Sequence, residues 1–106
     1  MTYQNVLSAL ADPTRRQILE SLREAPLSVA QIASRSTVSR PAVSQHLRVL
    51  ETATLVSVKP LGTRRLYSVN QHGLAELRAY LDSYWDDVLG AYAAKIESQQ
   101  NEEKKE

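Results

Sequence analysis

Three helix-start signals stand close together in the first half of the chain, and they restrict its fold more than any other feature of the sequence. Asp12 directly precedes Pro13, Ser28 precedes a short apolar run, and Ser39 stands two residues before Pro41. Asp and Ser side chains accept hydrogen bonds from the free N–H groups at a helix start, and proline fits the first turn because it has no N–H to lose. The sequence therefore predicts three short helices that begin directly after these caps.

Apolar spacing predicts two further helices. Residues 3–11 carry Tyr3, Val6, Leu7 and Leu10 at helical spacing, which indicates a short amphipathic helix. A long helix is predicted from residue 73 to about residue 98, with two overlapping apolar stripes. The first stripe is Leu74, Leu77, Leu81, Tyr84 and Val88, and the second is Trp85, Leu89, Tyr92 and Ile96. One small core covers only one of these stripes.

A β-hairpin is predicted between the fourth and the last helix. Residues 55–59 and 65–69 are rich in β-branched and bulky side chains, and Pro60 and Gly62 between them are typical of a hairpin loop. Short helices followed by such a hairpin have the element order of a winged helix-turn-helix. We therefore predict a mainly α fold with about five helices and a two-stranded wing.

The composition is that of one ordinary globular domain. The chain has 106 residues, 42% of them hydrophobic and 24% charged, so it can bury one modest core and has no length for a second. We expect a domain over residues 1–96 and a polar, disordered tail over residues 97–106, which contains no apolar residue. No stretch resembles a membrane span or a secretion signal, so a cytoplasmic protein is expected.

Positive charge and a polar helix face together favour DNA binding. Residues 1–65 hold nine Lys or Arg and four Asp or Glu, whereas residues 66–106 hold four and eight. At 100° per residue, the helix after Ser39 has an apolar side formed by Val43, Leu47 and Leu50 and a polar side formed by Pro41, Ser44, Gln45 and Arg48. A helix that enters the major groove needs short side chains near its start and Gln or Arg further along. A merely solvated face is the alternative, but this face has no carboxylate before Glu51.

Ten residues are candidates for contact with DNA. They are Ser39, Arg40, Ser44, Gln45, His46 and Arg48 in the helix, and Lys59, Thr63, Arg64 and Arg65 in the hairpin. The cations of the hairpin and Arg40 suit phosphates. His46 lies at the flank of the apolar side, where core packing and phosphate contact are both open. Arg15 and Arg16 are expected to serve the protein's own structure.

Three longer motifs occur in order along the chain. They are LADPTRRQIL from Leu10 to Leu19, SRPAVSQHLRVL from Ser39 to Leu50, and GTRRLYSV from Gly62 to Val69. Together they resemble the ArsR family of bacterial transcriptional regulators over roughly residues 3–96. The resemblance implies a homodimeric winged helix-turn-helix repressor of a palindromic operator, with the recognition helix at Ser39 to about Thr52 and the wing at Leu55 to Val69. Residues 73–92 resemble members that lack an identified inducer.

The resemblance also implies that no metal site is present. Metal-sensing members carry a Cys-x-Cys pair in the third helix, and the matching positions are Ser28 and Ala30. Their last-helix site falls on Gln71, Gly73, Tyr84 and Asp87, of which only Asp87 could bind zinc, and one carboxylate does not hold a tetrahedral ion. We expect no metal and no cofactor. The chain has no Cys and no Gly-rich phosphate loop, so we expect no enzymatic activity.

The apolar surplus of the first and last helices predicts a homodimer. The first helix has no obvious place in a three-helix core, and the last helix has one stripe too many. A monomer would expose both, and soluble monomers avoid large apolar patches. The predicted interface residues are Val6, Leu7, Leu10, Leu74, Leu77, Leu81, Tyr84, Trp85, Val88 and Tyr92.

The resulting prediction is a dimeric, sequence-specific regulator that represses transcription by covering promoter DNA. Its expected partners are double-stranded DNA with a palindromic operator and a second copy of the chain, with no membrane. Two alternatives stay open. One is a winged-helix module that holds a partner protein through Tyr84, Trp85 and Tyr92, and the other is a sensor of the same fold that responds to an effector.

Overall fold

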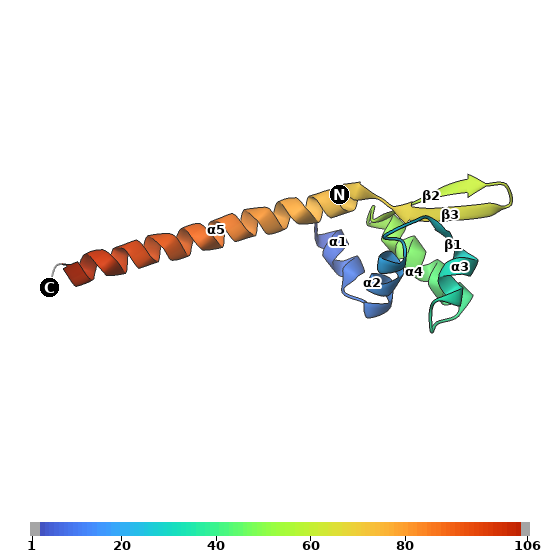
Figure 1. The fold of residues 1–106 in the computed structure, drawn as a ribbon, viewed down its shortest axis with the longest axis horizontal. Coiled ribbons are helices and arrows are strands. Elements are labelled where there is room, and N and C mark those ends of the chain that lie inside the picture. Colours follow the sequence, from blue (N-terminus) through green and yellow to red (C-terminus); the bar gives the residue numbers. More distant parts are fainter. Residues whose placement is uncertain (1–2, 105–106) are drawn as a thin grey trace.

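Five helices and a small sheet make up the part of the chain that the structure, a computed structural model, describes, which is residues 3–104. In chain order the elements are α1 (Tyr3–Leu10), α2 (Pro13–Ser21), β1 (Leu27–Ser28), α3 (Val29–Ser34), α4 (Arg40–Thr52), β2 (Val56–Leu61), β3 (Arg64–Val69) and α5 (Gln71–Lys104). The four short helices pack beside the sheet, and α5 leaves this body as a long rod (Figure 1). This is the predicted order of a winged helix-turn-helix.

The core is shared by all four short helices and the sheet. Its buried side chains are Val6, Ala9, Ile18, Leu22, Leu27, Ile32, Val43, Leu47, Leu50, Ala53, Leu55, Val56 and Tyr67. The interpretation that the first helix has no place in this core was wrong. Val6 and Ala9 are buried because α1 packs against α2, α4 and α5. Val6 has no exposed surface left for a partner chain, so it is removed from the predicted dimer interface.

The predicted cap of α2 is confirmed at Asp12. Its carboxylate accepts hydrogen bonds from the backbone N–H groups of Thr14, at 2.7 Å, and Arg15, at 3.2 Å. The bond from the Arg15 N–H is the main cause that holds the pKa of the Asp12 carboxyl below its usual value, and the bond from Thr14 adds to it. Both bonds favour the charged form, so the ionised carboxylate is the better cap.

Ser28 belongs to a strand and caps a helix at once. It lies in β1, opposite Leu66 of β3. Its Oγ accepts a hydrogen bond from the Gln31 N–H, while Gln31 Oε1 accepts one from the Ser28 N–H at 2.8 Å, which is a reciprocal capping box for α3. The sequence predicted the cap and missed the strand, because two residues are too few to show a period of two.

The sheet therefore has three strands instead of the predicted two. All pairs are antiparallel, and the order is β1, β3, β2. The wing, β2 and β3, turns through Gly62 and Thr63, and Gly62 has the left-handed φ of 63° that glycine adopts without steric cost. The turn is shorter than the predicted loop because Pro60 continues β2 opposite Arg65. β2 is an edge strand, where a residue without an N–H is tolerated.

The start of α5 is fixed by the turn that follows α4. Gly73 N–H donates to the Thr54 carbonyl oxygen at 3.0 Å, and Asn70 Oδ1 accepts from the His72 N–H at 2.9 Å. A Cβ on Gly73 would lie 2.6 Å from the same Thr54 oxygen, closer than real Cβ atoms approach. The absence of a side chain at Gly73 therefore lets α5 pass directly over this turn.

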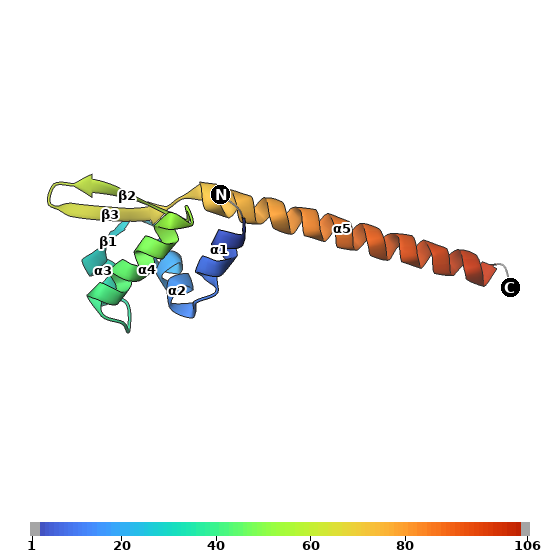
Figure 2. The same ribbon diagram turned by 180° about the vertical axis from the view of Figure 1, so that it is seen from behind.

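Beyond this junction α5 projects from the body. Tyr3 of α1 stacks on Tyr80 with ring centroids 4.0 Å apart, and the helix then continues away from α1 (Figure 1). Seen from behind, α5 and the wing point in opposite directions from the helical body (Figure 2). The helix extends to Lys104, the last residue that the structure describes, and does not stop near residue 98, because its polar end contains no Gly or Pro. The division at residue 96 between a domain and a disordered tail stays a prediction.

Gly73→Ala should destabilise the protein by about 1–3 kcal/mol, because the added Cβ meets backbone atoms of Thr54 and Ala53 that cannot turn away. Gly90→Ala is the matched control. It lies in the same helix, a Cβ there meets nothing within 4 Å, and alanine is the better helix former by about 1 kcal/mol. Urea unfolding at one protein concentration measures both, and equal stabilities would contradict the Gly73 contact.

Asp12→Asn should lower the thermal stability near neutral pH, and the difference from the wild type should shrink in acid. The folded pKa of Asp12 lies below its unfolded value of 3.8. The stabilisation by the charged carboxylate is therefore complete at pH values above the unfolded pKa. It is lost as the pH falls through the lower pKa of the folded state. Thermal unfolding of both proteins from about pH 7 to about pH 3 tests this. A difference in Tm that stayed the same at every pH would show that the charge contributes nothing.

Candidate nucleic-acid interface

α4 is held with one face in the core and the other in solvent. Ser39 caps it, since its Oγ accepts a hydrogen bond from the Ala42 N–H at 3.3 Å. On the inner face, Val43, Leu47 and Leu50 have no exposed surface. These contacts fix the rotation of the helix about its own axis, so the direction of the outer face is fixed too.

The outer face of α4 presents polar donors and no acid. Ser44, Gln45 and Arg48 are all exposed, and no Asp or Glu occurs between Arg40 and Leu50. The Ser39 hydroxyl oxygen accepts the capping bond, which leaves its O–H available as a donor. Such donors match the base-edge acceptors and phosphate oxygens of DNA.

His46 lies on the flank of α4 and not on its exposed face. It is half-buried, and it is near enough to the Asp12 carboxylate to contribute to the lowered pKa of that carboxyl. His46 is less exposed than Ser44, Gln45 and Arg48, and its contact with DNA stays a prediction.

Arg15 and Arg16 bind the protein's own backbone, as predicted. Arg15 Nε donates to the Ala9 carbonyl oxygen at 2.6 Å, and Arg16 Nη1 donates to the Leu10 carbonyl oxygen at 2.7 Å. Carbonyl groups at the end of a helix such as α1 lack partners within the helix. The two arginines thus join the end of α1 to α2.

The wing presents its cations without local acidic partners. Lys59, Thr63, Arg64 and Arg65 are exposed on β2, β3 and the turn between them. None of the three cations takes part in a salt bridge among the side chains that the structure describes. Their charge is therefore available to an external anion such as a phosphate.

Arg40, Arg64 and Arg65 meet at a depression that the sequence did not predict. It has a volume of about 230 Å³, and its other lining residues are Ser28, Val29, Ala30 and Thr63. The depression exists because β1 pairs with β3 and so brings the start of α3 to the wing. The strand that produces it is too short to leave a pattern in the sequence, so no signal for the depression was available.

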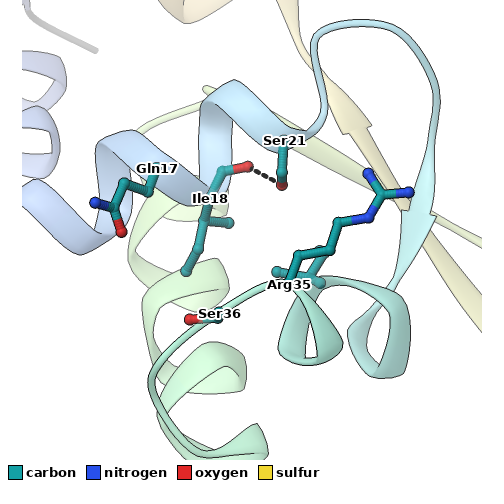
Figure 3. Close-up of a pocket in the computed structure, with 6 residues that line it drawn as sticks. Gln17, Ile18, Ser21, Arg35 and Ser36 are labelled. Atoms are coloured by element: carbon teal, nitrogen blue, oxygen red, sulfur yellow. Dashed lines mark hydrogen bonds between the residues drawn. The ribbon is translucent and has the colours of Figure 1, made fainter.

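A much smaller cavity lies between α2 and the end of α3 (Figure 3). Its volume is about 30 Å³, and it is lined by Gln17, Ile18, Ser21, Ile32, Arg35 and Ser36. The Ser21 hydroxyl donates to the Ile18 carbonyl oxygen at 2.5 Å, so this hydroxyl already has a partner. The space suits about one water molecule and is too small for an organic ligand.

The predicted dimer residues on α1 and α5 differ in exposure. Trp85 is 64% exposed, Tyr92 63% and Tyr84 60%. Leu7, Leu74 and Leu81 are exposed as well, and so are Leu89 and Ile96 of the second stripe. Leu10 and Leu77 are half-buried against the protomer's own core, and Val88 is half-buried too. The outer part of α5 thus carries a long apolar surface that its own domain does not cover.

Residues 3–104 show neither a cluster of potential metal ligands nor a helix that could cross a membrane. In that part of the chain, His, Asp and Glu side chains do not gather in the groups of three that could hold a metal ion. The expectation that no metal binds stays a prediction. None of the helices within residues 3–104 combines the length and the apolar character needed to cross a membrane.

Comparison with known proteins identifies the family. Residues 12–58 match the family described as "Bacterial regulatory protein, arsR family". The chain is 54% identical over 91 residues to the HTH-type transcriptional regulator Rv2034 of Mycobacterium tuberculosis, which covers 86% of this chain and 85% of that protein. It is 38% identical over 66 residues to the transcriptional repressor SdpR of Bacillus subtilis, which covers 62% of this chain and 73% of that protein.

The fold has matches among solved structures. One is the solution NMR structure of the homodimeric winged helix-turn-helix DNA-binding domain of Mb0332 from Mycobacterium bovis. It superposes on this chain with a TM-score of 0.64 at 30% sequence identity, and the match covers 79% of this chain and 78% of that one. The matched family and the two named relatives are transcriptional regulators and not enzymes. Sequence and structure thus confirm both the predicted fold and the predicted resemblance: the chain belongs to the ArsR family of bacterial transcriptional regulators.

Proposed function

We propose that this protein is a homodimeric repressor that binds a palindromic operator and blocks transcription by occupying promoter DNA. The observation that carries the proposal is the exposed, acid-free outer face of α4, next to wing cations without acidic partners. Repression is supported by the name of SdpR, a transcriptional repressor at 38% identity. Bacterial promoters lie in the cytoplasm, so the proposal includes that location.

The proposed contacts divide between bases and phosphates. Gln45 and Arg48 extend from the exposed side of α4 toward base edges in the major groove, and the short side chain of Ser44 permits close approach. Ser39 and Arg40, at the start of the same helix, are placed for phosphate oxygens. The wing residues Lys59, Thr63, Arg64 and Arg65 follow the backbone beside the groove.

A second copy of the chain is the proposed cover for α5. The helix has 34 residues, which corresponds to a length of about 50 Å, and its outer part exposes large apolar side chains to solvent. Two such helices related by a two-fold axis bury the same surface on each other. The homodimeric state of the Mycobacterium bovis relative supports this. The proposed interface residues are Leu7, Leu10, Leu74, Leu77, Leu81, Tyr84, Trp85, Val88 and Tyr92.

Gln45→Ala and Arg48→Ala should each weaken the preference for a sequence selected from random DNA, by about 1–3 kcal/mol where the side chain makes a bidentate base contact. Arg64→Ala should weaken binding to all sequences and reduce the salt dependence, because it removes a phosphate contact. Arg23→Ala is the control, since Arg23 follows α2, lies outside the wing and pairs with Glu20 at 3.0 Å. Binding isotherms at several salt concentrations measure these effects.

Two outcomes would contradict the proposal that α4 and the wing form the DNA-binding surface. Wild-type affinity in all of the α4 and wing variants would show that the contacts lie elsewhere. A wild-type protein that bound no DNA even at low salt would favour a module that binds only proteins.

Leu81→Glu together with Val88→Glu should dissociate the dimer and weaken operator binding, although neither residue is placed at DNA. Leu81 is 51% exposed and Val88 is half-buried. Neither belongs to the core or to the side chains packed against it, so the two charges should leave the protomer folded. Ser83→Glu adds one such charge on the opposite side of α5, at 100° per residue, and should leave the dimer intact. Sedimentation at low micromolar concentration measures the mass. A monomeric wild type with full operator affinity would rule out the proposed dimer.

A further inference from the structure

We infer that the depression between α3, α4 and the wing is an oxyanion site that holds one phosphate group among Arg40, Arg64 and Arg65. The inference deepens the proposed function and in part rests on it, because the DNA backbone is one source of such a group. A free phosphate or a small phosphorylated molecule is the other source. The chemistry that the site recognises is the same in both cases.

The charge of the site is the first reason. Three guanidinium groups line one depression of about 230 Å³, and no acidic residue lines it with them. None of the three takes part in a salt bridge or a side-chain hydrogen bond among the described residues. Cations gathered in this way repel one another until an anion enters. Guanidinium groups donate planar pairs of N–H bonds that fit the oxygens of a phosphate.

The remaining lining fits a compact anion. Val29 and Ala30 form an apolar wall and offer no group that would repel negative charge. Ser28 and Thr63 bring hydroxyl groups to the same depression, and a hydroxyl can donate to a phosphate oxygen. Ser28 Oγ accepts the capping bond from the Gln31 N–H, and its O–H stays available to donate to an anion. A phosphate group accepts such bonds on several oxygens.

The site lies where two parts of the proposed DNA-binding surface meet, the start of α4 and the wing. Arg40 is the first residue of α4, and Arg64 and Arg65 begin β3 of the wing. One phosphate bound by both elements would hold the wing against the start of the recognition helix. If the phosphate belongs to DNA, it sets the position of the protein along the backbone. If it belongs to a free molecule, it occupies the place of the DNA backbone and competes with the operator.

The test uses Arg40→Gln and Arg65→Gln, two exposed positions where the substitution keeps a long polar side chain. Arg78→Gln is the matched control, because Arg78 is exposed on α5 and pairs only with Asp82, at 3.8 Å. One arm titrates the full chain with inorganic phosphate or pyrophosphate without DNA and follows backbone amide NMR signals of residues 28–30 and 63–65. The other arm measures the affinity for DNA in phosphate-free buffer.

The expected result is saturable shifts at these amides in the wild type and the control, with binding about tenfold weaker in each site variant in at least one arm. Loss in both arms shows that free phosphate and the DNA backbone use the same site, and loss in the phosphate arm alone assigns the site to a free molecule. Loss in the DNA arm alone assigns the site to the DNA backbone only if free phosphate gives no saturable shifts in the wild type. Phosphate shifts that both site variants keep contradict the inference. Site variants equal to the wild type in both arms overturn the inference.

Failure of this inference is distinguishable from failure of the proposed function. In one case, Gln45→Ala and Arg48→Ala lose sequence preference, while Arg40→Gln and Arg65→Gln bind as the wild type does in both arms. The repressor proposal then stands and the phosphate site does not. If the wild type binds no DNA but saturates with pyrophosphate, and Arg40→Gln and Arg65→Gln weaken that binding, the phosphate site stands without the repressor proposal.

Discussion

The burial of one face of α4 fixes the direction of the opposite, polar face, which we propose for contact with DNA. Val43, Leu47 and Leu50 are fully enclosed, so the helix cannot rotate without exposing them. A rotation by one residue, 100°, would turn polar side chains such as Ser44 toward the core, where a polar group without a partner is costly. The direction of Gln45 and Arg48 is therefore determined by apolar residues on the opposite side of the same helix.

The turn after α4 transmits this orientation to α5. Thr54 follows α4 with a left-handed φ of 56° and accepts a hydrogen bond from the Gly73 N–H through its carbonyl oxygen. Because Gly73 has no Cβ, the two segments meet at the distance of backbone contact. This backbone contact between the turn after α4 and the start of α5 holds the two helices at a defined angle. In the proposed dimer, this junction would determine the spacing of the two recognition helices.

Local signals predicted local structure well, and contacts between distant residues account for what was missed. Asp12, Ser28 and Ser39 mark their helices because a cap acts within three residues of its own position. β1 exists only through its pairing with β3, and the place of α1 in the core depends on its packing against three other helices. The arginine-lined depression follows from β1 and could not be found without it. Individual DNA contacts and the dimer interface remain predictions, since they involve partners outside the protomer.

In the proposed function, α5 forms the dimer while α4 and the wing contact DNA. α5 and the wing extend in opposite directions from the helical body (Figure 2), so pairing through the outer part of α5 leaves the exposed faces of α4 and the wing uncovered. One protomer offers a single α4 with few exposed side chains for base contact. Two linked protomers bind the second half-site at a high effective concentration, which strengthens binding without any new kind of contact. DNA affinity would therefore fall steeply once the protein is diluted below the concentration at which it dimerises, and the apolar stripe of α5 would control operator occupancy from outside the DNA surface.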